Sequence, residues 1–442
     1  MALEFPSRKV WSILPFCALA LPFMTANASA TPTLTTLKSF CNTGTPCSGS
    51  SAFPQPMIED GSGNFFGATA FGGSHGGGNV FEIKKVGSSY TYTDLYDFCP
   101  SASCSDGQAP VDRLVMDTSG NLYGETQYGG TSPYCNGGCG TIFELSPNGA
   151  GSIYALTTLY DFCVNSSCTD GEYPKGGLTY VGAPGSSYNG SSALYGTAIH
   201  GGSANAGVDF ALTNVSSTPA YSVIYNMCSA TNCADGAVPT GLIPDGSGNL
   251  YGVTAEGGAN PISAGIVYEL SPAGGGAFTQ TVLWTFCATN SSCPDGQFPD
   301  GPLVMSSSGK LFGTTHHGGS NGEGTVFRVT PAGTSSTETV RYSFCSLSSC
   351  TDGSIPVNGG LALDGSGNVY DTTSLGGAYN QGSVYELTGT TLTTLYSFCP
   401  TPGCTDGADP EGGVALDASG NVFGQTNYSG AYNGGSMFKL TP

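Results

Sequence analysis

One phrase of the sequence, YDFCPSASCSDG at residues 96–107, decides the architecture because it returns at a nearly constant interval. It holds two cysteines five residues apart and then Asp-Gly. Related phrases are YDFCVNSSCTDG from Tyr160 and YSFCPTPGCTDG from Tyr396. The mean interval is roughly 60 residues, and a period of this size indicates a repeat architecture. The first cysteine of the phrase lies at Cys41, Cys99, Cys163, Cys228, Cys287, Cys345 and Cys399.

Each repeat carries four short segments that are typical of β-strands. In the sixth repeat they are residues 360–364, 368–373, 382–387 and 393–398, rich in β-branched and aromatic residues and separated by Gly, Asn, Asp and Ser. The first two segments are joined by a turn of the form Asp-x-Ser-Gly-Asn, in which Asp and Asn bond their own backbone and Gly supplies a positive φ. This turn begins at Asp60, Asp117, Asp245, Asp364 and Asp417.

The two ends of the repeat array complement each other. Residues 34–41 form a fourth strand with no repeat before it, and residues 435–440 form a third strand with no fourth strand after it. If the first strand completes the last blade, two open sheet edges disappear. We therefore predict that residues 31–442 form one all-β domain, a seven-bladed β-propeller of four-stranded blades built from repeats of about 55–65 residues.

The repeat resembles a known family. Gly-Asn-Leu-Tyr-Gly at 248–252, Gly-Gly at 257–258, Gly-Thr-Val-Phe at 324–327 and Leu-Tyr-Ser-Phe at 395–398 are similar to the GloVer tandem repeat of bacterial choice-of-anchor secreted proteins. The resemblance covers nearly all of residues 33–442. It implies an extracytoplasmic propeller and no particular catalytic activity. Members of the family often end in an anchoring segment, and since the C-terminus here shows none, we expect release from the cell.

The N-terminus indicates secretion. Arg8 and Lys9 precede an apolar run at residues 10–24 and the small residues Ala28-Ser29-Ala30, which predicts a signal peptide at residues 1–30 that is cleaved after Ala30. No later apolar run is long enough for a membrane span. The chain has 11 Lys+Arg against 31 Asp+Glu, a net charge of −20, which disfavours nucleic acid and anionic membranes. We expect a secreted monomer without a cofactor.

The cysteine pairs are predicted to be disulfides. Seventeen cysteines occur and Cys17 lies in the signal peptide, which leaves an even number for an oxidising compartment. The Cys-x4-Cys spacing differs from the Cys-x2-Cys of zinc and thioredoxin-like sites, and no histidine accompanies it. The Asp-Gly after each pair reads as a turn toward the next inner strand. The predicted pairs are Cys41–Cys47, Cys99–Cys104, Cys135–Cys139, Cys163–Cys168, Cys228–Cys233, Cys287–Cys293, Cys345–Cys350 and Cys399–Cys404.

Two sets of positions vary between repeats while the framework repeats, and both lie in loops that should share a face with the cysteine pairs. One set precedes Gly-Gly, and the other follows the proline that leads into the first strand. Aromatic, polar and charged residues at such positions suit a ligand, although the same residues also occur in solvated loops. The candidate ligand-binding residues are Tyr128, His200, Glu256, His317 and Tyr428 in the first set and Lys175, Asp300 and Glu411 in the second.

Signatures of common enzymes are absent from the sequence. It contains no phosphate-binding loop and no HExxH, so we assign no catalytic or metal-binding residues. We expect a disulfide-stapled binding scaffold for an extracellular glycan or protein. The alternatives are a secreted lyase or hydrolase that acts on a polysaccharide or lactone through acidic residues at the central funnel, a His-Glu-His metal site formed by His200, Glu256 and His317, and a structural envelope component.

Peptide mapping without reduction tests the disulfide prediction. Each cysteine should be recovered linked to its partner in the same loop, including Cys41 with Cys47, and closing such a loop should add about 2 kcal/mol of stability. Mass spectrometry of the non-reduced digest measures the pairing. Peptides that link cysteines of different repeats would contradict it.

Overall fold

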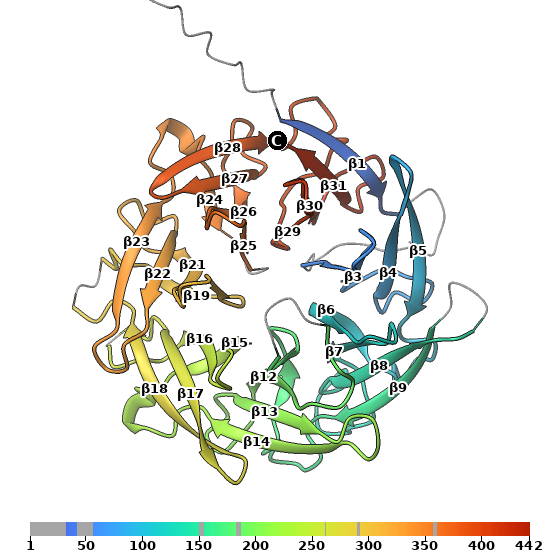
Figure 1. Ribbon diagram of the computed structural model, residues 1–442, viewed down its shortest axis with the longest axis vertical. Helices are drawn as coiled ribbons and strands as arrows, with labels where there is room; N and C mark the ends of the chain where they lie inside the picture. The colour runs from blue at the N-terminus through green and yellow to red at the C-terminus, as the bar shows by residue number, and fades with distance from the viewer. Residues whose placement is uncertain are drawn as a thin grey trace, which may run out of the picture. The chain divides into compact units, whose positions relative to one another are not determined.

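The computed structural model describes residues 32–41, 56–149, 154–182, 187–260, 262–289, 292–356 and 360–442. The predicted signal peptide, residues 1–30, and the predicted disulfide partner Cys47 lie outside these ranges. The described residues form seven antiparallel sheets that follow one another around a ring in chain order (Figure 1). The predicted all-β, seven-bladed propeller is therefore confirmed.

Each blade has four strands from the centre of the ring outward. The innermost strands are β2 (Ile58–Glu59), β6 (Gln108–Met116), β10 (Glu172–Pro174) with β11 (Thr179–Tyr180), β15 (Ala237–Pro244), β19 (Gln297–Pro299) with β20 (Val304–Met305), β24 (Ser354–Pro356) with β25 (Ala362–Leu363), and β29 (Val414–Leu416). The second strands are β3 (Phe65–Thr69), β7 (Leu122–Tyr128), β12 (Leu194–His200), β16 (Leu250–Glu256), β21 (Leu311–His317), β26 (Val369–Leu375) and β30 (Val422–Thr426).

The outer half of each blade is longer. The third strands are β4 (Asn79–Val86), β8 (Thr141–Pro147), β13 (Val208–Thr213), β17 (Ile266–Gly274), β22 (Thr325–Thr330), β27 (Ser383–Thr388) and β31 (Ser436–Thr441). The fourth strands are β5 (Ser89–Asp97), β9 (Tyr154–Asp161), β14 (Ala220–Asn226), β18 (Ala277–Thr285), β23 (Thr337–Ser343), β28 (Thr391–Ser397) and β1 (Thr33–Ser39). Two short 3-10 turns, η1 (Thr231–Cys233) and η2 (Ser348–Cys350), lie in cysteine loops.

Most inner strands begin earlier than the sequence pattern predicts. In blade 2, β6 starts directly after Asp-Gly, and its register against β7 shifts between Val111 and Val115. Asp112, inside the shifted segment, has a φ of 62°, which interrupts the regular ladder. Pro110 also lacks the N–H that a regular ladder needs. The residue before it, Ala109, has a φ of 55°, which bends the strand. Because of this interruption, the first few residues of the strand do not show the alternating pattern by which strands are predicted.

The N-terminal strand closes the ring as predicted. β1 pairs antiparallel with β31, with Leu34 opposite Leu440 and Ser39 opposite Ser436. Leu34 packs against the core between blades 6 and 7, and Leu37 packs against the core between blades 7 and 1. In Figure 1 the blue β1 accordingly lies beside the red β31.

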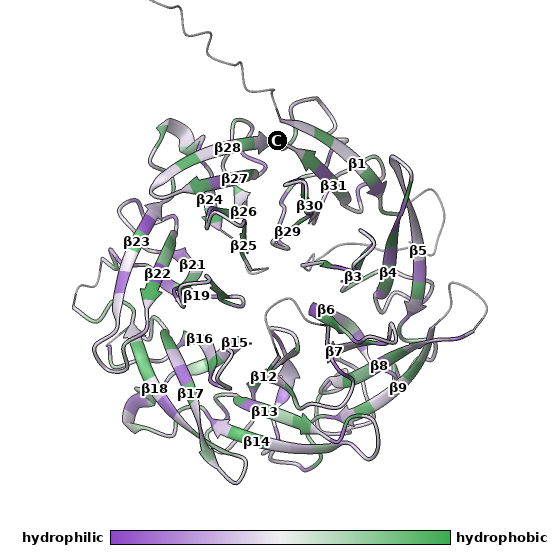
Figure 2. Ribbon diagram, in the orientation of Figure 1, coloured by the Kyte–Doolittle hydropathy of each residue, from purple (hydrophilic) through white to green (hydrophobic). Residues whose placement is uncertain are grey.

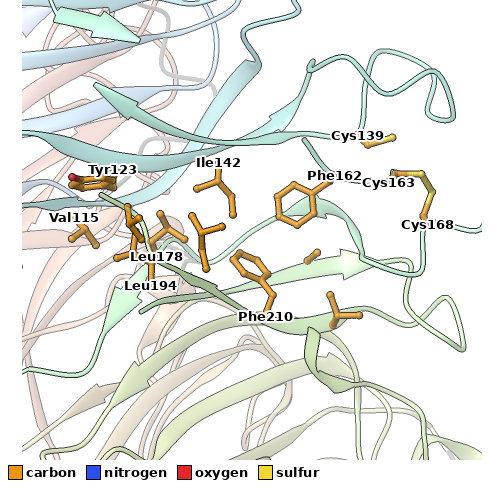
Figure 3. Close-up of a cluster of buried hydrophobic side chains, with 14 of the residues drawn as sticks. Val115, Tyr123, Cys139, Ile142, Phe162, Cys163, Cys168, Leu178, Leu194 and Phe210 are labelled. Atoms are coloured by element: carbon orange, nitrogen blue, oxygen red, sulfur yellow. A yellow bond between two sulfur atoms is a disulfide. The ribbon is translucent and has the colours of Figure 1, made fainter. Parts of the chain in front are cut away.

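The hydrophobic core is divided into seven clusters, one between each pair of neighbouring blades. Hydrophobic residues accordingly occur in the strands all around the ring (Figure 2). Figure 3 shows the cluster between blades 2 and 3, where Phe162 lies against Phe210. Phe65 of blade 1 stacks on Phe423 of blade 7 with ring centroids 4.1 Å apart, so the hydrophobic packing continues between the last and first blades.

One aromatic contact recurs between blades. Phe98, directly before Cys99, is fully buried and meets Phe143 in the third strand of the next blade, with centroids 5.1 Å apart. Gly124 makes room for that ring, because a Cβ there would lie 2.6 Å from Phe143 Cζ. The equivalent pairs, 5.1–5.4 Å apart, are Phe162–Phe210, Phe286–Phe327, Phe344–Tyr385 and Phe398–Phe438.

The Asp-x-Ser-Gly-Asn turns are confirmed at the opposite end of the strands from the cysteine loops. In the first of them the Asn64 backbone N–H donates to Asp60 Oδ1 at 2.9 Å, and the Asn64 side chain donates to Asp60 Oδ2. The same backbone bond is present in the turns that begin at Asp117, Asp245, Asp364 and Asp417. These carboxylates are engaged by their own turns, which supports a structural role.

Removal of β1 tests the closure. A chain that begins at Phe40 should be at least about 5 kcal/mol less stable than one that begins at Pro32, because the buried surface of two leucines and a full strand pairing are lost. It should also self-associate through the exposed edge of β31. Urea unfolding and light scattering measure both effects. Equal stability of the two chains would show that β1 is dispensable.

Candidate functional site

The cysteine loops and the loops after the second strands lie at one end of the blades. In blade 2, Gln108 at the start of β6 pairs with Tyr128 at the end of β7, and Thr141 at the start of β8 pairs with Asp161 at the end of β9. We call this end the cysteine-loop face. It comprises the cysteine loops 99–104, 163–168, 228–233, 287–293, 345–350 and 399–404 and the loops 70–78, 129–140, 201–207, 257–265, 318–324, 376–382 and 427–435, as far as the structure describes them.

Exposed hydrophobic side chains gather on this face. Among the described residues, only one large exposed hydrophobic side chain, Val86 at the end of β4, lies at the opposite end of the blades. Ordinary surface hydrophobics are scattered singly, whereas their concentration on one face is typical of a binding surface. Those on the cysteine-loop face are Phe71, Tyr128, Tyr134, Val164, Ile262, Leu347, Leu375, Tyr379, Tyr428 and Tyr432.

Two predicted residues, Tyr128 and His200, are brought together through a residue that the sequence analysis missed. Tyr173 of blade 3 contacts Tyr128 of blade 2 edge-on, with centroids 5.5 Å apart, and contacts the His200 ring at 6.0 Å. Phe298 holds the same place in blade 5, where its ring lies 6.2 Å from that of His317. Both residues lie two positions after Asp-Gly. The residue at this position also varies between repeats, and that variation is the signal that would have found them.

Lys175 and Asp300, predicted separately, form an ion pair that joins blades 3 and 5. Lys175 Nζ lies 2.9 and 2.8 Å from the two carboxylate oxygens of Asp300. Their side chains are 26% and 13% exposed, so the pair is largely shielded. Burial by itself lowers the pKa of Lys175, but the charge and hydrogen bonds of Asp300 and the charge of Asp112 raise it above the usual value.

Glu411 of blade 7 belongs to a different polar group. The Asn427 side-chain amide donates to Glu411 Oε2 at 3.1 Å and to Asp409 Oδ2 at 3.3 Å. Burial and the neighbouring charge of Asp409 raise the pKa of Glu411 to about 7. Burial also raises the pKa of Asp409. This amide and two carboxyl groups offer both donors and acceptors to a ligand at neutral pH.

The remaining predicted residues, Glu256, His317 and Tyr428, are exposed. Within the described part of the chain, no hydrogen bond, ion pair or ring contact joins any two of His200, Glu256, Asp300, Glu411 and His317. His200, Glu256 and His317 also do not converge on a common point within 4.8 Å as metal ligands must. The described residues thus do not form the His-Glu-His site.

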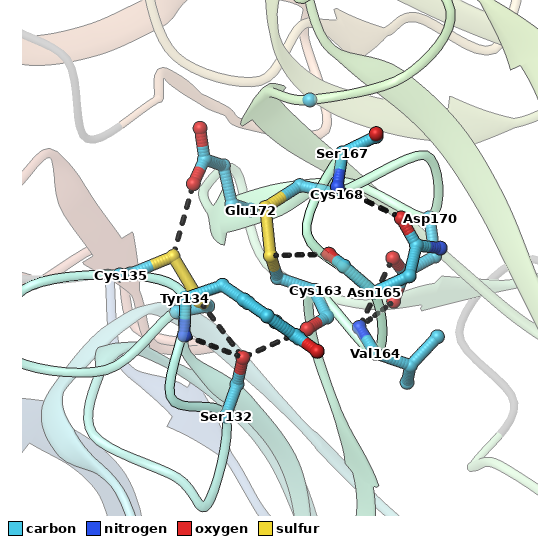
Figure 4. Close-up of a disulfide and its surroundings, with 12 residues drawn as sticks. Ser132, Tyr134, Cys135, Cys163, Val164, Asn165, Ser167, Cys168, Asp170 and Glu172 are labelled. Carbon is cyan, nitrogen blue, oxygen red and sulfur yellow. Dashed lines mark hydrogen bonds between the residues drawn. A yellow bond between two sulfur atoms is a disulfide. The ribbon is translucent and has the colours of Figure 1, made fainter.

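The sulfur atoms are engaged in disulfides. Seven pairs are bonded within their own loops: Cys99–Cys104, Cys135–Cys139, Cys163–Cys168, Cys228–Cys233, Cys287–Cys293, Cys345–Cys350 and Cys399–Cys404. Figure 4 shows two of them side by side, Cys135–Cys139 and Cys163–Cys168, with Glu172 Oε2 3.0 Å from Cys135 Sγ. Sulfur and carboxylate atoms of these five residues lie within 4.8 Å of one another, but disulfide sulfurs are not thiolate ligands.

The Asp of each Asp-Gly has a role that the sequence analysis did not foresee. Asp106 accepts hydrogen bonds from the Tyr96 hydroxyl at 2.9 Å and from the Cys99 backbone N–H at 3.2 Å, which ties the fourth strand to the cysteine loop. Burial and Asp106 raise the pKa of Tyr96. The same aromatic-to-Asp bond is present at Asp170, Asp235, Asp295, Asp352 and Asp406. The variable residues therefore lie beside loops that disulfides and hydrogen bonds hold in place.

Known proteins resemble the chain at the level of repeat and fold. A family model described as the Gloeobacter/Verrucomicrobia repeat matches residues 24–189 and 183–348. No curated protein matches the sequence. The extracellular domain of a hybrid two component system from B. thetaiotaomicron is 12% identical over 91% of this chain, with a TM-score of 0.50, and an identity this low shows the fold alone. This chain spans 40% of that protein's length.

A second solved structure, a luciferin-regenerating enzyme, is 13% identical to the chain. The alignment covers 89% of this chain and 92% of that chain, with a TM-score of 0.42. Among the described residues, no helix is long and apolar enough to cross a membrane.

Glu411 gives the site a testable pH dependence. Its pKa rises from 4.5 to about 7 on folding, so the ionised carboxylate opposes folding above pH 7 and has no such effect below pH 4.5, where both states are protonated. Glu411→Gln removes this cost. Because Glu411 is partly exposed, we expect a gain of about 1–2 kcal/mol at pH 8 and almost none at pH 4.

Urea unfolding of both proteins at the two pH values measures the difference. The comparison at pH 4 serves as the internal control, because the Gln side chain retains an acceptor for Asn427. A stability difference of the same size at pH 4 and pH 8 would contradict the assignment.

Proposed function

The chain belongs to the Gloeobacter/Verrucomicrobia repeat family, and we propose that it is an extracytoplasmic binding protein that takes a glycan on its cysteine-loop face. Disulfides persist in oxidising compartments, which supports a location outside the cytoplasm. One observation carries the proposal: nearly all of the exposed large hydrophobic side chains in the described residues, six of them aromatic, lie on one face of the ring.

The chemistry of that face suits a sugar better than a purely apolar ligand. Tyrosine presents a flat apolar ring with a hydroxyl that can hydrogen-bond, and the apolar faces of sugar rings pack well on such surfaces. Tyr128 and Tyr428 are 37% and 57% exposed. Nearer the centre, Lys175 with Asp300 and Asn427 with Glu411 supply fixed donors and acceptors that match sugar hydroxyls.

The rim is also suited to selective binding because it is ordered before the ligand arrives. Disulfides and partly buried hydrogen bonds from aromatic side chains to Asp fix the loops, so little conformational entropy is lost when a ligand binds. The binding positions vary from blade to blade, which favours a ligand without sevenfold symmetry over a repetitive surface.

A glycan array with the labelled protein tests the proposal, with Tyr128→Ala and Tyr428→Ala as site variants and Val86→Ala as the control. Loss of one aromatic platform should weaken glycan binding about tenfold, because such contacts contribute on the order of 1–2 kcal/mol. Val86→Ala removes an exposed hydrophobic side chain from the opposite end and should bind as the unmodified protein does.

A second experiment addresses proteins. If the array is negative and the protein instead captures a defined secreted protein in a manner abolished by Tyr428→Ala, the face binds protein and the glycan proposal is wrong. Glycan binding that survives both tyrosine substitutions would place the site elsewhere on the molecule.

A further inference from the structure

The end of the ring opposite the cysteine-loop face contains two adjoining cavities. Their volumes are 530 and 440 Å³, and both are lined by Arg113, Thr179 and Ile243. The larger cavity reaches Asp60 and Gly61, which belong to an Asp-x-Ser-Gly-Asn turn, and so lies toward that end of the blades. Cavities of this size accommodate small organic ligands.

The smaller cavity lies on the axis of the ring, because every blade contributes to it through its innermost strand or the residues beside it. Most of its walls are aliphatic. Arg113 is the only charged residue among the described residues that line it, in a protein whose net charge is −20. One residue from each blade, in chain order, is Met57, Arg113, Thr179, Ile243, Val304, Ala362 and Ala415.

The Arg113 guanidinium has no counterion in the described part of the chain. The only carboxylate that acts on it is that of the adjacent Asp112, which accepts a hydrogen bond from the Gly176 backbone N–H. Burial lowers the pKa of Arg113 and the charge of Asp112 opposes this. A shielded cation without a partner is costly, and an anionic group placed against it removes that cost.

The smaller cavity, which we call the Arg113 chamber, is distinct from the polar residues of the cysteine-loop face. Between the level of Lys175 and that of Arg113, the backbones of blades 3 and 4 meet so closely that a Cβ on Gly176 would lie 2.3 Å from Gly241 Cα. Gly241 in turn lies beside Pro302 of blade 5. The inner strands thus converge between the two ends of the axis, and a ligand of the Arg113 chamber enters from the turn end.

We propose that the Arg113 chamber binds a small organic carboxylate with an aliphatic body. The guanidinium pairs with the carboxylate in the bidentate geometry that arginine favours. The aliphatic body packs against Val304, Ala362 and Ala415 on the other side of the axis. Glu59 and Asp60 border the larger cavity and disfavour a second anionic group, so a monocarboxylate is preferred to a dicarboxylate.

Calorimetric titration with octanoate tests the proposal, with octan-1-ol and octylammonium as neutral and cationic probes of the same chain length. Octanoate should bind saturably at one site per chain, and the other two probes should bind at least about tenfold more weakly, since a charged hydrogen-bonded pair is lost. Arg113→Met should weaken octanoate binding to the same extent. Arg113→Lys keeps the charge but loses the bidentate geometry, so it should restore only part of the binding.

Two further variants separate the chamber from general effects of charge and folding. Lys84→Met removes an exposed positive charge outside both cavities and should leave octanoate binding unchanged. Ala415→Leu fills the chamber without touching the guanidinium and should weaken binding of octanoate. It keeps the test valid if Arg113→Met proves unstable.

Three results would overturn the proposal: no saturable octanoate binding, equal binding of octanoate and octan-1-ol, or full octanoate binding by both Arg113→Met and Ala415→Leu. None of them affects the glycan proposal, which concerns residues at the other end of the ring.

Discussion

The ring depends on one contact, the insertion of a buried side chain from the end of each blade against the third strand of the next. This side chain is a phenylalanine in every blade except blade 3, where it is Met227. Phe98 and Phe143 illustrate it, with no exposed surface on either ring. Burying a phenylalanine contributes about 2–3 kcal/mol, but here the partner always belongs to the neighbouring repeat. A single repeat therefore cannot bury its own hydrophobic face. The hydrophobic faces of all seven blades are buried only when the last blade packs against the first.

The same phrase that supplies the aromatic wedge also builds the binding rim. Directly after the wedge come the disulfide and the Asp that binds the strand-four aromatic residue and the loop backbone, as Asp106 binds Tyr96 and Cys99. Packing and rim geometry are thus coupled, because the loop starts where the wedge is anchored. Variation can then accumulate at neighbouring positions such as Tyr128 and Tyr173 without disturbing the core, since these side chains lie outside the seven hydrophobic clusters.

The two ends of the axis differ in chemistry although the repeats are similar. Lys175 and Asp300 form a shielded ion pair near the cysteine loops, whereas the opposite end is largely aliphatic around the guanidinium of Arg113. The departures from the repeat are responsible. Arg113 occupies a position that is Gly177 in blade 3 and Pro302 in blade 5, and glycines such as Gly176 let the inner strands approach each other between the two ends.

The sequence by itself determined the framework of this protein. The spacing of the cysteine phrases, the strand-like segments and the complementary ends predicted the number of blades and the closure of the ring, because these features depend on periodicity and local backbone preference. The local disulfides followed from short loops whose cysteines have few other partners. Only the tertiary structure decided which variable residues meet. Lys175 and Asp300 are 125 residues apart in the chain, and Tyr173 of blade 3 contacts Tyr128 of the neighbouring blade 2. Such contacts depend on how seven sheets converge on one axis, and the pattern of a single repeat contains no information about distances between repeats.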